Sequence, residues 1–577
     1  MWFYMMCVVV SAWQCFVVAL DTQLGGVGNL LHEWHVVAIS LANALLLLSP
    51  FWLLRRRWWL LIWLPLTLLT LWCLAQMCYC RAYDDLMPWR SLGLTDNVNS
   101  TLMASTVALL RWQDLLIVVP FLVLIVVGIF VGKSRKGIRG SNSRAFLLSI
   151  FAAVAFGIIG YVDGDNNYSR RFLHNFSNKD YFARNGLLPY LTFTLHEEFK
   201  THSVSDDERA MVLRFLEQDC PQYSDNGYCH QQRRNLVLII VESLHTWPIG
   251  MTIDGREVTP VLNRLVASDS VIYAPHVLFQ TSHGHSSDAH FIYNTGLLPL
   301  RDGAVAVGHG DGPYPSLANA LSGYDCREII CTPGMNWNQT VTARTYGFDV
   351  LYTRDDLTAS GDLNRHNNMD DAALTDFASR LLPELRHPFF LEMVTMTMHA
   401  PYNDGKVPDT WITASDTLNA EARGYLNCVH FTDSCIGAFI NELQQQSLSQ
   451  STIVAIVSDH TQLYYNRIHG IPDREALPRD WGIPMIVTGI DTTMIYEPVI
   501  GQVDVFPTLI DLMGANSYRW KGLGHSILRY PVVGAIQPRN MTVIGDSAAM
   551  TAQQRKAWDV SRLLILDRAN MANRLSW

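Results

Sequence analysis

The chain has 577 residues, of which 49% are hydrophobic and 16% are charged, and its formal net charge is -9. This length exceeds that of one typical domain, so we expect at least two. The mild charge, with no long cluster of Lys and Arg in the polar part of the chain, argues against a nucleic-acid-binding protein.

Five apolar segments near the N-terminus are long enough to cross a bilayer, which takes roughly 20 residues each. They are Trp2–Leu20, Trp34–Leu54, Trp58–Cys78, Asp114–Val131 and Ala145–Val162. The first has no basic n-region and no small-residue cleavage site, so we interpret it as a span and not as a signal peptide. We therefore predict a transmembrane domain of five helices over residues 1–163.

The loops between these segments indicate the orientation of the chain. Arg55–Arg57 separates the second and third segments, and Lys133–Arg144 carries five basic residues between the fourth and fifth. The loop Asp21–Glu33 contains neither Lys nor Arg. Because basic loops stay in the cytoplasm, we predict a cytoplasmic N-terminus and an extracytoplasmic location for everything after about Asp163.

Residues 164–234 are polar, and we interpret them as a linker with short helices such as Asp206–Glu217. Cys220 and Cys229 flank a turn-rich stretch in this region and form the best candidate disulfide. Cys428 and Cys435 are predicted two turns apart on one helix, roughly 10 Å, which is too far for a bridge.

From Asn235 to the C-terminus, short runs rich in Val and Ile alternate with helical stretches. The runs are NLVLIIV, REIIC, PFFLEMVTM, TIVAIV and GIPMIVT, and the helical stretches include Val258–Ala267, Met369–Leu382 and Leu418–Gln446. Continuous apolar runs are typical of strands buried on both faces. We therefore predict an α/β domain over residues 235–577, with helices on both sides of a sheet.

Polar residues follow three of these runs at the point where each strand should end. Glu242 follows NLVLIIV, His399 follows PFFLEMVTM, and the pair Asp459-His460 follows TIVAIV after one serine. Ligands of open α/β sheets bind beyond the carboxyl ends of the strands. Each residue alone is more often a cap or a loop residue, but their convergence predicts a site for Mn, Mg or Zn.

A fourth segment, Phe279–Phe291, has the sequence FQTSHGHSSDAHF and is rich in hydroxyls and imidazoles. Ser286 and Ser287 precede a predicted helix, where backbone N–H groups favour a phosphate. A cation beside such a hydroxyl would lower its pKa and make it a nucleophile. The plainer alternative is an N-cap serine.

Taken together, these segments resemble the lipoteichoic-acid-synthase type of phosphoglycerol transferase in the sulfatase and alkaline phosphatase superfamily. The resemblance is carried, in the family's order, by VES at Val241–Ser243, DGREVTPVLNRL at Asp254–Leu265, QTSHGHSSDAHF at Gln280–Phe291, MNWNQ at Met335–Gln339, MHAPY around His399, SDH at Ser458–His460 and GQVDVFPTL at Gly501–Leu509. It implies a sulfatase-like extracytoplasmic domain anchored in a bacterial inner membrane.

The resemblance also implies roles for individual residues. Glu242, Asp459 and His460 would hold a divalent cation, commonly manganese in this family, with Ser286 beside it as the nucleophile. The family usually has threonine at that position, and serine keeps the needed oxygen. His399 matches a histidine near the substrate phosphate, and Trp337 an aromatic residue at the head-group pocket. The glycerolphosphate polymerases carry Arg where this chain has Gln339, so a bidentate phosphate clamp is lost here.

We therefore predict a phosphotransferase that moves a phosphoglycerol head group from a phospholipid, with phosphatidylglycerol favoured, to a glycan or lipid acceptor through a covalent Ser286 intermediate. Alternatives are a phosphoethanolamine transferase and a sulfatase-like hydrolase. Ser286 is followed by neither Pro nor Arg, as a formylglycine sulfatase would need. A catalytically idle membrane scaffold is the alternative of another class.

Overall fold

The computed structural model describes residues 2–23, 34–54, 60–83, 86–87, 109–133, 142–162, 178–199, 204–218, 234–301, 303–334, 336–366, 370–402, 406–408, 410–413, 418–461, 468, 482–515, 517–538, 541–545 and 548–575. The chain divides into two compact units. Unit 1 comprises Met1–Leu92 and Asn99–Thr201, and unit 2 comprises Gly93–Val98 and His202–Trp577.

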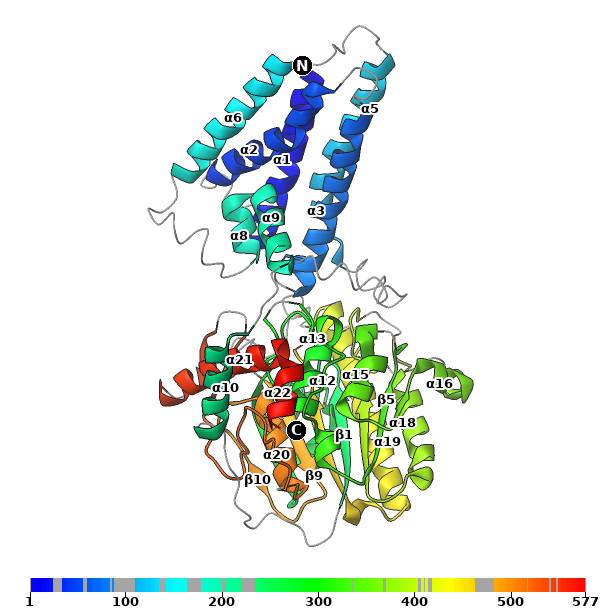
Figure 1. Cartoon of the computed structure of the whole chain (residues 1–577). Helices are drawn as coiled ribbons and strands as arrows, with labels where there is room; N and C mark the ends of the chain where they lie inside the picture. Colours follow the sequence, from blue (N-terminus) through cyan, green and yellow to red (C-terminus); the bar gives the residue numbers. More distant parts are fainter. Residues whose placement is uncertain are drawn as a thin grey trace. The chain divides into compact units, whose positions relative to one another are not determined.

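Unit 1 contains five long apolar helices, each coinciding with one predicted span (Figure 1). They are α1 (Trp2–Gln23), α2 (Trp34–Leu48) with the 3-10 turn η2 (Ser49–Leu53), α3 (Trp63–Tyr83), α5 (Leu115–Lys133) after η5 (Trp112–Asp114), and α6 (Ser143–Val162). All five are long and apolar enough to cross a membrane. The predicted five-helix transmembrane domain is thus confirmed.

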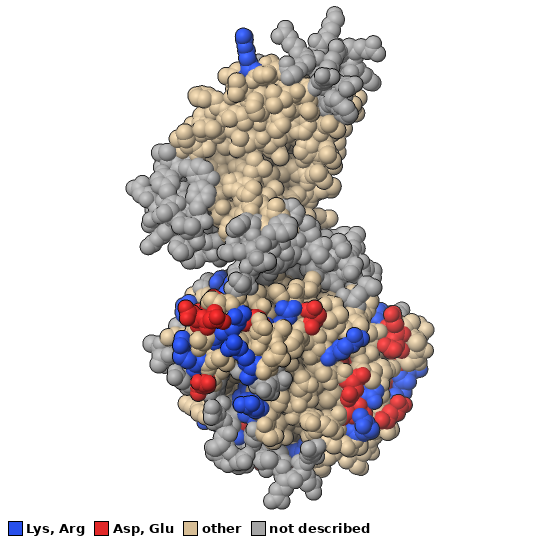
Figure 2. All heavy atoms as spheres, in the orientation of Figure 1, with Lys and Arg blue, Asp and Glu red and all other residues tan. Residues whose placement is uncertain are grey.

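Charged groups inside unit 1 join the ends of three of these helices. Arg81 of α3 forms a bidentate pair with Asp114, at 2.7 and 3.0 Å, and its Nε donates to Asp21 of α1 at 3.1 Å. Outward-facing side chains are apolar, including Phe130 and Phe151, and the face shown in Figure 2 is almost free of charge. Such a surface suits contact with lipid.

In the described part of the region predicted as a linker there are three helices, α8 (Asn178–Asn185), α9 (Leu187–Phe199) and α10 (Asp206–Gln218). Phe182 and Tyr190, from α8 and α9, share a core with Phe16 of α1, so these two helices belong to unit 1. Helix α10 belongs to unit 2, where Arg209 pairs with Asp567 at 2.5 Å. The predicted Cys220–Cys229 bridge lies outside the described residues.

Unit 2 is built on a mixed sheet with the strand order β10-β4-β9-β8-β1-β7-β5-β6, and β11 also pairs with β4. The strands are β1 (Asn235–Val241), β4 (Val271–Leu278), β5 (Asp325–Ile330), β6 (Val350–Tyr352), β7 (Phe389–Val394), β8 (Thr452–Ser458), β9 (Ile483–Thr488), β10 (Met494–Ile495) and β11 (Ile500–Gly501). Strand β9 runs antiparallel to both β4 and β8. The predicted α/β sheet is confirmed, and two short hairpins, β2–β3 (Thr252–Ile253 and Arg256–Glu257) and β12–β13 (Gly534–Ile536 and Val543–Gly545), stand apart from it.

Helices surround this sheet, and the longest described one, α19, spans Ala420–Gln445 and packs beside α18 (Figure 1). The others are α11 (Pro260–Val266), α12 (Ser286–Thr295), α13 (Val305–Gly308), α14 (Leu317–Ala320), α15 (Gln339–Tyr346) after η6 (Asn336–Asn338), α16 (Arg354–Ala359), α17 (Asp362–Arg365), α18 (Asp370–Leu381) with η7 (Leu382–Glu384), α20 (Val505–Leu512) after η11 (Gln502–Asp504), α21 (Ala548–Leu566) and α22 (Arg568–Leu575), with η8 (Ser449–Ser451) leading into β8.

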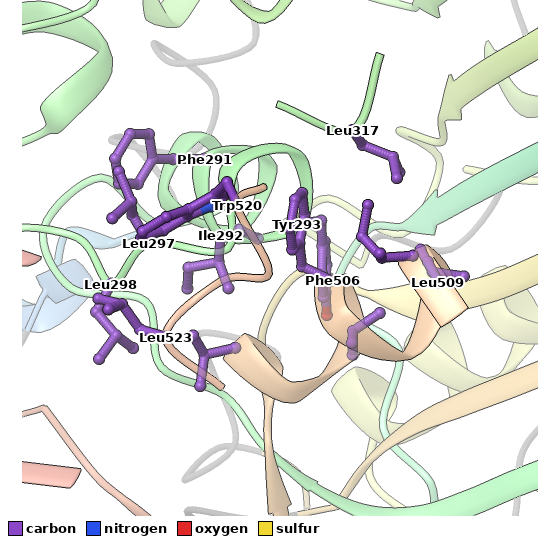
Figure 3. Packing of buried hydrophobic residues seen from close by; sticks show 14 of the residues in the cluster. Phe291, Ile292, Tyr293, Leu297, Leu298, Leu317, Phe506, Leu509, Trp520 and Leu523 are labelled. Carbon is purple, nitrogen blue, oxygen red and sulfur yellow. The ribbon is translucent and has the colours of Figure 1, made fainter. Parts of the chain in front are cut away.

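The main core fixes helix α12, which starts at Ser286. Phe291 and Ile292 of α12 pack in one buried cluster with Phe506 and Leu509 of α20 (Figure 3). Trp520 lies in the same cluster and donates its indole N–H to the carbonyl of Thr295 at 2.6 Å. A helix held this tightly presents the residues of its first turn with little freedom, since cores are close-packed.

Candidate active site

The carboxyl ends of β1 and β8 bring three predicted ligands together. These strands are parallel neighbours, and Val241 is the register partner of Ser458. The residues that directly follow these strands, Glu242 after β1 and Asp459 after β8, therefore leave the sheet at the same point. His460 is the next residue after Asp459. All three side chains are buried, and one donor atom of each lies within 4.8 Å of the others.

Ser286 joins this group from helix α12. Its Oγ lies 3.3 Å from Glu242 Oε2 and 3.3 Å from His460 Nε2. The same Nε2 is 3.5 Å from Asp459 Oδ2 and 4.0 Å from Glu242 Oε1. One hydroxyl, one imidazole nitrogen and two carboxylates thus converge, although they come from three separate parts of the chain.

Local hydrogen bonds fix the orientation of the Glu242, Asp459 and His460 side chains. Asp459 Oδ1 accepts from the backbone N–H of Ser243 and of His460, both at 2.7 Å. Ser243 donates its hydroxyl to Glu242 Oε1 at 2.6 Å. His460 Nδ1 lies 2.8 Å from the carbonyl of Thr461, which favours the proton on Nδ1 and leaves the Nε2 lone pair for a ligand.

The electrostatics of the group favour a cation. Burial and the neighbouring Glu242 carboxylate raise the pKa of Asp459 to about 7. Burial opposes ionisation of Glu242, but His460 and His399 more than offset it, so its pKa lies below its ordinary value. Burial likewise disfavours the charged His460, yet Asp459 and Glu242 hold its pKa above the ordinary value. Two buried carboxylates beside one imidazole are stabilised by a bound cation.

The donor set therefore fits a divalent metal, with Glu242, Asp459 and His460 as the residues that would hold it. Carboxylate oxygens and one imidazole nitrogen suit Mn, Mg or Zn. The geometry itself does not select among these metals.

The turn before α12 separates Ser286 from Ser287. Asp288 accepts from the backbone N–H of Ser282 at 2.8 Å and of Gly284 at 3.0 Å, which closes the turn. His285 has φ 41°, a left-handed conformation that is costly for a residue with a side chain. Ser287 donates its hydroxyl to the carbonyl of Gly284 at 2.7 Å, so it caps the turn while Ser286 faces the carboxylates.

The three predicted substrate-binding residues come from two other segments, the loop after β7 for His399 and the region of η6 and the start of α15 for Trp337 and Gln339. His399 follows β7, and its Nδ1 is 2.8 Å from the carbonyl of Ala400. Trp337 is half-buried, and its backbone has a left-handed conformation with φ 49°. Gln339 is 7% exposed and contacts Thr332 at 3.2 Å and His290 at 3.4 Å.

Three residues that position this site were not predicted from the sequence. Ser243 and Asp288 orient the ligands and the turn, and Lys406 donates to the carbonyls of His399 and Pro401. The signal that could have found Asp288 is its place in SSDAH, two residues after Ser286, where a carboxylate can accept from backbone N–H groups at a helix start. Lys406 is one basic residue in a polar loop, and the sequence around it gave no comparable signal.

Comparison with known proteins agrees with this architecture. Residues 1–207 match the family model of the lipoteichoic acid synthase N-terminal domain, and residues 234–515 match that of the sulfatases. The chain is 25% identical over 483 residues to the lipoteichoic acid synthase of Staphylococcus aureus (strain USA300), covering 79% of this chain and 73% of that protein. It is 24% identical over 519 residues to that of Staphylococcus saprophyticus, covering 84% and 79%.

Two solved structures share the fold. The lipoteichoic acid synthase LtaP from Listeria monocytogenes aligns with a TM-score of 0.52 at 18% identity, over 63% of this chain and 97% of that one. The lipooligosaccharide phosphoethanolamine transferase A (EptA) from Neisseria meningitidis aligns with a TM-score of 0.53 at 15% identity, over 90% and 96%.

An α/β domain of this kind, carried by a chain with five membrane-spanning helices, defines a multi-pass membrane phosphotransferase. The match to the lipoteichoic acid synthase N-terminal domain precedes the match to the sulfatases along the chain. These matches support a protein similar to the lipoteichoic acid synthases, with a sulfatase-type domain.

Proposed function

We propose that this enzyme transfers a phosphoglycerol head group from a phospholipid, with phosphatidylglycerol as the favoured donor, to a glycan or lipid hydroxyl. The observation that carries the proposal is the position of Ser286 Oγ, 3.3 Å from both Glu242 and His460 at the start of α12. A serine in that position can attack phosphorus while backbone N–H groups of the helix start face the phosphate.

The reaction has two steps. Ser286 Oγ forms a bond to phosphorus as the bond to the diacylglycerol oxygen breaks, the serine proton is released, and the departing oxygen takes up a proton. The acceptor hydroxyl then attacks the same phosphorus, loses its proton and frees Ser286. His399, at the loop after β7, is the residue we assign to move protons on and off these oxygens.

A divalent cation held by Glu242, Asp459 and His460, manganese by family resemblance, would supply positive charge that favours the ionised serine and the phosphoryl oxygens. The chain's own residues orient the rest of the site. Asp288 fixes the turn, Ser243 orients Glu242, and Thr461 sets the His460 tautomer.

We further propose that the protein resides in a bacterial inner membrane with unit 2 outside the cytoplasm. The two basic loops support this orientation, since both fall on the same side of a five-span chain. An enzyme on that face meets lipid donors without extracting them from the bilayer.

The test uses the full chain in vesicles of phosphatidylglycerol or phosphatidylethanolamine, with mass spectrometry of the Ser286 peptide and of released diacylglycerol. We expect a phosphoglycerol adduct on Ser286 with the first lipid, and none in Ser286→Ala. A phosphoethanolamine adduct instead would favour the alternative head group, which Gln339 in place of arginine keeps open. Metal-loaded protein that turns over neither lipid would indicate an idle scaffold.

A further inference from the structure

A second group of metal-ligating side chains lies inside unit 2, apart from Glu242, Asp459 and His460. Glu328 and Glu392 face one another as register partners on the parallel strands β5 and β7. His290 of α12 completes the group, with Nδ1 3.8 Å from Glu328 Oε1 and 3.9 Å from Glu392 Oε1. All three are buried, and one donor atom of each lies within 4.8 Å of the others.

The two carboxylates lack a compensating positive charge. Among the residues that the structure describes, no lysine or arginine pairs with Glu328 or Glu392. Asn294, one turn after His290, donates to Glu392 Oε2 at 2.9 Å. Glu392 Oε1 has no hydrogen-bond partner, although the residue is 0% exposed, and it lies 3.9 Å from His290 Nδ1. A buried carboxylate oxygen without a hydrogen-bond partner destabilises the folded state, so a proton or a bound cation should neutralise it.

His290 is placed to act as a metal ligand. Its Nδ1 faces both carboxylates from helix α12, and imidazole nitrogen is a common ligand of Zn²⁺. Separations of 3.8 and 3.9 Å from Nδ1 to the two carboxylates are too long for hydrogen bonds. Two donors about 2 Å from one tetrahedral ion lie about 3.3 Å apart, so a bound ion would draw these side chains together by about half an ångström.

A fourth donor stands beside the other three. The side-chain amide of Gln339 approaches His290 Nδ1 to 3.4 Å, and its other end contacts Thr332. Rotating this amide by half a turn presents its oxygen to the cluster, and the Thr332 hydroxyl can accept as well as donate. Four nitrogen and oxygen donors in a closed site suit tetrahedral Zn²⁺, whereas Mg²⁺ requires six ligands and keeps waters.

We propose that His290, Glu328 and Glu392, with Gln339 as the fourth donor, form a second divalent-cation site of the zinc class. The site ties helix α12 to strands β5 and β7. His290 follows Ser286 by one helical turn, so the bound cation lies beneath the first turn that presents the nucleophile. The assignment does not depend on which head group the enzyme transfers.

The experiment measures metal bound to the full chain in detergent after equilibration with Zn²⁺ and removal of free metal. We expect two equivalents in the wild type, one in Glu392→Gln, one in Glu328→Gln and one in Asp459→Asn, which removes only the cation beside Ser286. Glu384→Gln, an exposed change in the same unit, should keep two. Two equivalents in Glu392→Gln would overturn the proposal, because a pair of carboxyls that merely shares protons needs no metal.

A second measurement applies if the buried glutamine variants do not fold. Asp459→Asn leaves the proposed second site intact, so Co²⁺ should occupy it at one equivalent and give the visible absorption of a four-coordinate ion. Excess Mg²⁺ should not displace it. Asp459→Asn protein that melts cooperatively but binds no Co²⁺ would refute the site, while leaving the proposed phosphotransfer untouched.

Discussion

Val241 and Ser458 are direct partners at the ends of two adjoining parallel strands, β1 and β8. This pairing places the next residues, Glu242 and Asp459, side by side where ligands of α/β sheets bind. A slip of one residue between the strands would separate the two carboxylates, so the register of β1 against β8 sets the proposed metal centre.

The first prediction concerns Asp459. Asp459→Asn should release the cation beside Ser286 and lower turnover by more than about 100-fold, because a direct ligand matters at least as much as its outer-shell partners. Metal analysis and diacylglycerol release measure the two effects. Asp269→Asn, an exposed change, should alter neither. Retention of activity in Asp459→Asn would contradict the site.

The second prediction separates the two serines. Ser286→Ala should abolish head-group release with little effect on folding, and Ser286→Thr should keep part of the activity. Ser287→Ala should lose about 1 kcal/mol of stability, since it removes the 2.7 Å bond to the Gly284 carbonyl, but should still turn over. Steady-state rates and melting curves of the three variants check this. The reverse pattern would identify Ser287 as the nucleophile.

The third prediction concerns orientation in the membrane. A reporter that is active only outside the cytoplasm should be active when fused after Trp577 and inactive when fused after Arg57. The reason is the basic loop at Arg55–Arg57, which should stay in the cytoplasm. An inactive reporter in a Trp577 fusion that is expressed at full length would reject the proposed extracytoplasmic location.

The fourth prediction concerns the turn that ends α12. Gly296 has φ 66°, and a Cβ there would lie 2.6 Å from Phe506 Cδ1 and 2.8 Å from Gly522 Cα. Gly296→Ala should therefore combine a left-handed cost of about 1–2 kcal/mol with an overpacking cost of about 1–3 kcal/mol.

A matched control for that change is Gly250→Ala. Gly250 has φ 81°, but a Cβ there would have no atom within 4 Å, so only the conformational cost of about 1–2 kcal/mol should remain. In denaturant titrations, the free energy of unfolding of Gly296→Ala should be clearly lower than that of Gly250→Ala. Equal stabilities would show that the packing in Figure 3 relaxes freely around the added methyl.

Much of the architecture follows from local pattern. The length of the apolar segments alone predicts the five spans, because a bilayer imposes a minimum helix length. Runs such as NLVLIIV and TIVAIV predict β1 and β8, and helical periodicity over 418–446 predicts α19, which spans Ala420–Gln445. The chemistry-bearing residues Glu242, His399, Asp459 and His460 were recognisable because each follows a strand.

Other features depend on how distant segments pack. Strand β9 lies between β4 and β8 and runs antiparallel to both. Its apolar run resembles those of the parallel strands β1 and β8, because strand direction depends on the connections and not on the run itself. The folded turn is also needed to show that Ser286 faces Glu242 while Ser287 caps Gly284.

Glu328 and Glu392 show both what the local sequence predicts and what only the tertiary structure determines. Both stand inside apolar runs, REIIC and PFFLEMVTM, whose pattern alone indicates that an acid there is carried into the interior. Their pairing across β5 and β7, and the approach of His290 from helix α12, follow from the fold and not from either run. The physical reason is that contacts between distant segments depend on strand register and packing, which no local stretch of sequence contains.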